Sequence, residues 1–63
     1  MSLYELYYSR MTRAENERDF EALRSAYCDA IADHNCGLDL FDDELDTLCD
    51  LYIDICCRCG WPY

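Results

Sequence analysis

The segment Asp42–Asp54, DDELDTLCDLYID, places an aspartate at every fourth position, with apolar residues recurring between the acids. Extended in both directions, the apolar series consists of Phe41, Leu45, Leu48, Tyr52, Ile55 and Cys59. Because steps of three and four residues place side chains on one face of an α-helix, the pattern predicts an amphipathic helix over about residues 40–59. We expect Asp39 to be its N-cap and Gly60 to end it.

The chain before Gly37 also predicts helix, because it contains no proline and no glycine. It carries two apolar stripes at helical spacing. The first consists of Leu3, Tyr7, Met11 and Ala14, and the second of Phe20, Leu23, Tyr27, Ala30 or Ile31, and His34. The stripes point about 145° apart on a helical wheel. We therefore expect helix over residues 3–35 with a break near residues 12–19, where TRAE is a candidate capping box; one long helix with two apolar faces is the alternative.

The expected architecture is an all-α single domain, residues 1–63, in which a turn at residues 35–39 joins two antiparallel helices. The first stripe then belongs to an N-terminal helical extension of this hairpin. A hairpin leaves much apolar surface uncovered, which predicts a homodimer in a four-helix arrangement. The predicted apolar interface consists of Leu3, Tyr7, Tyr8, Trp61 and Tyr63.

The net charge of −9, from 14 acidic residues against five arginines, argues against direct binding to nucleic acid and favours a basic partner. The candidate contact is an acidic stripe formed by Asp43, Asp46, Asp50 and Asp54. A solvated outer face of an amphipathic helix explains the same pattern. A sharper alternative is that the stripe imitates a phosphate backbone and occupies a DNA-binding surface.

The six cysteines raise the alternative of a zinc-binding structural module built on Cys56 and Cys59, with His34 and Cys36 completing four ligands. In a hairpin the two pairs lie about 30 Å apart, at opposite ends, so a single chain cannot join them, whereas an antiparallel dimer could bring one chain's turn to the other's open end. Reduced cysteines packing as small apolar residues is the expected reading, with no metal and no cofactor. His34 has no partners that would form a catalytic site, so we expect no enzyme.

The chain shows neither a secretory signal nor the ~20 apolar residues of a membrane span, which predicts a cytoplasmic protein with no membrane partner. Over its full length, from MSLYELYYSRMTRAENERDFEALRSAYCDA to IADHNCGLDLFDDELDTLCDLYIDICCRCGWPY, it resembles small early proteins of lambdoid bacteriophages, encoded between the exonuclease and excisionase genes. The resemblance rests on size and overall pattern. It implies an accessory protein in the host bacterial cytoplasm that contacts a host protein and modulates replication, cell-cycle timing or the choice between lysis and lysogeny.

Overall fold

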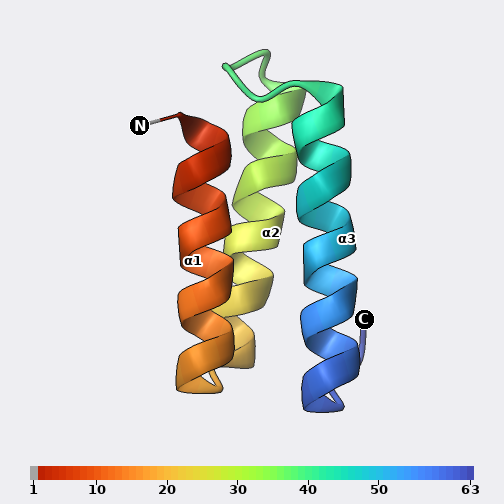
Figure 1. Cartoon of the computed structure of the whole chain (residues 1–63). Coiled ribbons are helices and arrows are strands. Elements are labelled where there is room, and N and C mark those ends of the chain that lie inside the picture. The colour runs from red at the N-terminus through yellow and green to blue at the C-terminus, as the bar shows by residue number, and fades with distance from the viewer. Residues whose placement is uncertain (1) are drawn as a thin grey trace.

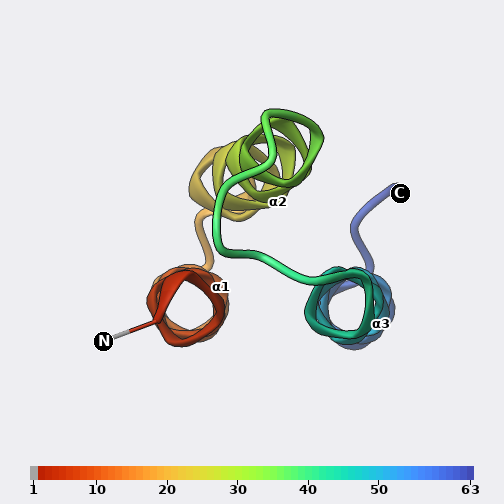
Figure 2. The same ribbon diagram turned by 90° about the horizontal axis from the view of Figure 1, so that it is seen from above.

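The computed structural model describes residues 2–63, which form three α-helices and contain no β-strand. Helix α1 spans Leu3–Glu17, α2 spans Phe20–Asn35 and α3 spans Asp42–Cys59. Successive helices run in opposite directions (Figure 1), and the view from above places them at the corners of a triangle (Figure 2). The prediction of an all-α fold is confirmed. None of the three helices is long and apolar enough to cross a membrane.

The first chain reversal lies at Arg18 and Asp19. Arg18 adopts a left-handed conformation (φ 54°) that ends α1, and the Asp19 side chain accepts a hydrogen bond of 3.1 Å from the Ala22 amide to cap α2. Thr12, the first residue of the candidate capping box TRAE, lies inside α1, where its hydroxyl donates to the Tyr8 carbonyl. The TRAE capping box is therefore not formed, because the helix continues through it.

The second reversal is longer than the sequence suggests. Helix α2 ends at Asn35, Gly37 takes a positive φ of 78°, and α3 begins only at Asp42. Asp39 is not the N-cap of α3. Phe41 occupies that position, and its amide donates to the Glu44 carboxylate at 3.2 Å. The physical reason is Leu40, which is only 2% exposed: the chain first enters the core and then starts the helix.

The core receives side chains from all three helices. Its largest fully buried side chains are Met11, Leu23, Leu48, Ile55 and Cys56. Between α2 and α3, the rings of Tyr27 and Tyr52 stack with centroids 4.3 Å apart. Burial of each large aliphatic side chain contributes about 1.5–3 kcal/mol. Of the apolar seam predicted for α3, Leu48, Tyr52 and Ile55 are buried and Leu45 and Cys59 are half-buried. Phe41 precedes the helix and is exposed, so its place in the seam is corrected.

Helix α1 is a full member of the bundle rather than an extension of a hairpin. Its predicted stripe supplies Tyr7, Met11 and Ala14 to the core. The chain reversal at Arg18 explains why two stripes with different directions on a continuous helical wheel face the same interior. Much of the apolar surface from which a second copy was inferred is therefore covered within one chain.

Polar contacts fix α1 against α2. The Tyr7 hydroxyl donates to the Asp33 carboxylate, and Arg10 pairs with Asp29 at 3.1 Å while lying 5.4 Å from the centre of the Tyr7 ring. Burial, together with the hydrogen bond to Asp33, raises the pKa of Tyr7 to about 12. The buried tyrosine therefore keeps its proton far into the alkaline range.

Candidate interaction surface

The net charge of the chain arises from one continuous part of it. Residues 25–57 contain nine acidic residues and no arginine, while the other five acidic residues equal the five arginines in number. In the fold, this segment comprises most of α2, the α2–α3 loop and nearly all of α3. The negative charge is therefore concentrated at the loop end of the bundle and along α3.

The acidic stripe lies on the outside of α3. Asp43, Asp46, Asp50 and Asp54 are all exposed. They follow one another at steps of three and four residues, opposite the buried Leu48 and Ile55. Neighbouring like charges at these spacings cost about 0.2–0.5 kcal/mol per pair. None of the four forms an ion pair with another of the residues 2–63.

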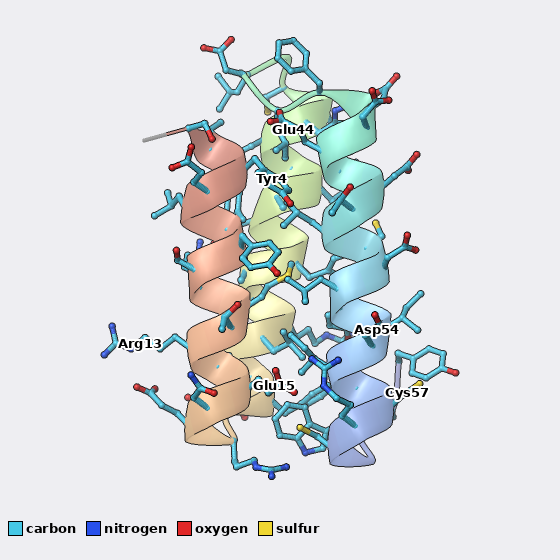
Figure 3. All side chains as sticks on the ribbon, in the orientation of Figure 1. Tyr4, Arg13, Glu15, Glu44, Asp54 and Cys57 are labelled. Atoms are coloured by element: carbon cyan, nitrogen blue, oxygen red, sulfur yellow. The ribbon has the colours of Figure 1, made fainter. Side chains whose placement is uncertain are left out.

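At the other end of the bundle, the acidic residue Glu15 has an ion-pair partner on another helix. Both guanidinium nitrogens of Arg58 that face Glu15 donate to its carboxylate, at 2.8 and 3.0 Å. Figure 3 shows Glu15 pointing from α1 into the space beside α3, whereas Arg13 points away from the bundle. The hydrogen bond from Arg58 lowers the pKa of Glu15. Glu15 is thus neutralised locally, and the stripe aspartates are not.

The predicted apolar interface is not a single surface. Tyr7 is 4% exposed and belongs to the core, so its assignment to an interface is corrected: burial against α2 and α3 takes it out of reach of another chain. Leu3 and Trp61 are half-buried and pack against the same core, Trp61 with its ring 5.5 Å from that of Phe20. Tyr8 and Tyr63 remain exposed, but they belong to α1 and to the C-terminal segment, respectively.

Only one of the six cysteines is buried, two are half-buried, and Cys28, Cys36 and Cys57 are exposed. Cys56 is buried, which raises the pKa of its thiol, and Cys59 is half-buried with its sulfur 3.3 Å from a guanidinium nitrogen of Arg18. Within residues 2–63, no three histidine, cysteine or acidic side chains are grouped as a metal site would require.

His34 has a structural role that the sequence did not reveal. Its Nδ1 lies 2.9 Å from the Leu40 carbonyl oxygen, and its Nε2 lies 3.0 Å from an Asp42 carboxylate oxygen. The first contact joins the end of α2 to the loop, and the second joins it to the first residue of α3. The ring therefore helps to hold the intervening loop, at the opposite end of α3 from Cys59.

The hollows on the surface are shallow and lie along α1. One is lined by Tyr4, Glu5, Tyr8 and Ser9 of that helix, with the two tyrosine rings 5.9 Å apart. A second continues past Tyr8 toward Asn16. A third hollow lies between α1 and α2 and is lined by Arg10, Arg13, Ala14, Glu17, Ala22 and Ser25.

Comparison of the chain with protein-family models, with curated proteins and with solved structures finds no match. The candidate surface must therefore be judged on its own geometry.

Proposed function

We propose that this chain is a non-enzymatic accessory protein that binds a basic surface of another protein through the acidic stripe on α3. The observation that carries the proposal is the row of four exposed aspartates without ion-pair partners among residues 2–63. A three-helix core holds this row on one continuous helix, so that its spacing is set before a partner binds. Complementary charge would speed association and select among partners.

The biological setting of the proposal is a phage-infected bacterium. The full-length resemblance to lambdoid early proteins suggests a host protein in the cytoplasm as the partner, and replication, cell-cycle timing or the choice between lysis and lysogeny as the process affected. The charge pattern supports a protein partner over nucleic acid, because phosphates would be repelled by the nine acidic residues of residues 25–57.

Charge reversal on the stripe tests the proposal. We expect Asp46→Lys with Asp50→Lys to abolish capture of a bacterial host protein from lysate, while helicity and melting stay close to those of the original chain. Lysine is a better helix former than aspartate, so the fold should tolerate the change.

A control of equal net charge is available at the other end of the bundle. Glu17→Lys with Glu21→Lys changes two exposed acidic residues outside the stripe. This control should still capture the partner. Equal loss with both variants would show that only total charge matters, and equal retention would contradict a role for the stripe. If the captured protein binds DNA and duplex DNA displaces the chain, the stripe acts as a phosphate mimic.

We also propose a homodimer. The apolar surface available to it is smaller than the one predicted from the sequence, because Tyr7 is buried. Its support is the exposed Leu6 and Tyr8 on α1, which lie outside the core that covers Tyr7. Sedimentation equilibrium over a wide concentration range tests it. A mass that stays at one chain throughout removes the dimer and leaves the acidic stripe unaffected.

A further inference from the structure

The α2–α3 loop exposes two large apolar side chains that lie three positions apart in the sequence. Leu38 is 52% exposed and Phe41 is 70% exposed, although Leu40 between them is buried. Among residues 2–63, only the C-terminal Tyr63 exposes a larger fraction of a large apolar side chain than Phe41 does. This loop therefore presents apolar surface to water in a bundle that covers most of its other large side chains.

The exposure of these side chains does not arise from a loosely held loop. The Leu38 amide donates to the Asp33 carbonyl at 3.1 Å, and the Leu40 carbonyl contacts His34. The Phe41 amide donates to Glu44 of α3. With Leu40 inserted in the core, the backbone is tied to α2, to α3 and to the interior. A segment already held in one conformation binds a partner without a large ordering cost.

The Phe41 side chain has no evident structural task. The N-cap contact with Glu44 uses the backbone amide of Phe41, which any residue except proline can supply. Leu38 likewise contributes its amide to the turn while its side chain stays in solvent. Removing the two side chains should therefore leave the fold intact.

Carboxylates surround this apolar pair. Asp39 and Asp42 are exposed within the same short segment, and Asp43 follows as the first residue of the acidic stripe. A second copy would bring like charges together, and an anionic membrane would repel them. The chemistry that complements the loop is an apolar pocket in another protein, edged by arginine or lysine side chains.

We propose that the α2–α3 loop is a preformed docking segment whose Leu38 and Phe41 enter a basic-edged apolar pocket of the partner protein. This inference rests on the proposed function, since the loop leads directly into the acidic stripe at Asp43 and both would contact the same partner protein. The Leu38 and Phe41 side chains become buried on binding and supply most of the affinity, and the nearby aspartates select the pocket by charge.

Photo-crosslinking identifies the contact directly. A photoreactive phenylalanine analogue replaces Phe41 in one preparation and Tyr63, at the C-terminus, in the control. After illumination in bacterial lysate, the crosslinked peptides are sequenced. We expect the probe at position 41 to join one host protein at an apolar site with adjacent lysine or arginine residues, and the probe at position 63 to give no such adduct. An adduct with a second copy of this chain would overturn the proposal.

Affinity measurement with that purified host protein completes the test. We expect Leu38→Ala with Phe41→Ala to weaken binding by at least about tenfold, as for central interface anchors. Tyr63→Ala, the loss of an exposed aromatic side chain in the C-terminal segment, should change binding by less than about twofold. Unchanged melting of both variants shows that the fold is retained.

The possible failures are distinguishable. If the Leu38/Phe41 double variant binds as tightly as the original chain while the Asp46/Asp50 double variant does not bind, the docking role of the loop is wrong and the proposed function stands. If the original chain captures no host protein and the probe at position 41 crosslinks none, both proposals fail.

Discussion

The two ends of the bundle handle their side chains in opposite ways. At the end formed by the Arg18–Asp19 reversal and the C-terminal segment, Trp61 packs on Phe20 and Arg58 neutralises Glu15. At the end formed by the α2–α3 loop, Leu38 and Phe41 stay in solvent beside aspartates. At the first end, these two pairs join one part of the chain to another, although Tyr63 is exposed there. At the second end, Leu38 and Phe41 are available to a partner, which is the expected property of a recognition surface.

The largest difference in the free energy of unfolding is expected between removing an apolar side chain inside the bundle and removing one at the loop end. Ile55→Ala creates a cavity at a fully buried position and should lower the free energy of unfolding by about 2–5 kcal/mol. Phe41→Ala, at a position 70% exposed, should change it by less than about 0.5 kcal/mol. Urea denaturation followed by circular dichroism measures both. A comparable cost for Phe41→Ala would mean that the loop end is a structural element.

A smaller effect is expected at the interior polar contact between α1 and α2. Tyr7→Phe removes the hydrogen bond to Asp33 and should cost about 1 kcal/mol. Because the pKa of Tyr7 is raised to about 12 in the folded chain, above the ordinary value near 10, its contribution is complete below about pH 10 and is lost as the pH rises toward 12.

Alkaline unfolding gives the corresponding measurement. The original chain should lose stability between about pH 10 and 12, and Tyr7→Phe should lose less over the same range. Tyr8→Phe, at an exposed position on the same helix, serves as the control and should behave as the original chain does. Identical alkaline profiles for all three chains would exclude a linkage through Tyr7.

The smallest effect on stability is expected for the ion pair between Arg58 and Glu15, at the end of the bundle that holds the Arg18–Asp19 reversal. Arg58→Ala should lower the melting temperature only slightly, because water screens a solvent-accessible ion pair. Since Arg58 lowers the pKa of Glu15, the contribution of the pair is present above the ordinary glutamate pKa and is lost as the pH falls through the lowered value. Thermal melting in acid should therefore converge for the original chain and Arg58→Ala. The exchanged pair Glu15→Arg with Arg58→Glu should recover part of the loss at neutral pH, and no recovery would contradict a direct interaction.

The helices themselves could be predicted from the sequence because their signals are local. The apolar steps of α3, the absence of proline and glycine before Gly37, and the terminating Gly60 all act through neighbours three or four residues apart. The break was expected only within a broad region. Asp19 as an N-cap and Arg18 in a left-handed conformation decide its position, and arginine gives no sequence signal for that conformation.

The contacts between helices could not be predicted in the same way. The pairs Tyr7–Asp33 and Glu15–Arg58 join residues distant in sequence, and their formation depends on how the helices pack. The apolar residues of α1 suggested an interface with a second chain, because the sequence does not show that the chain reverses after α1 and covers them itself. Nor does the series Leu38, Asp39, Leu40, Phe41 itself show which apolar side chain enters the core.

The sequence by itself determined the helical state, the inward and outward faces of α3 and the strongly acidic character of the chain, because periodicity, capping and charge are properties of short segments. Only the tertiary structure decided that α1 completes the core, that Tyr7 is buried and that Leu38 and Phe41 are presented to solvent. These outcomes depend on chain reversals and on competition for a limited interior, which couple residues far apart in the sequence.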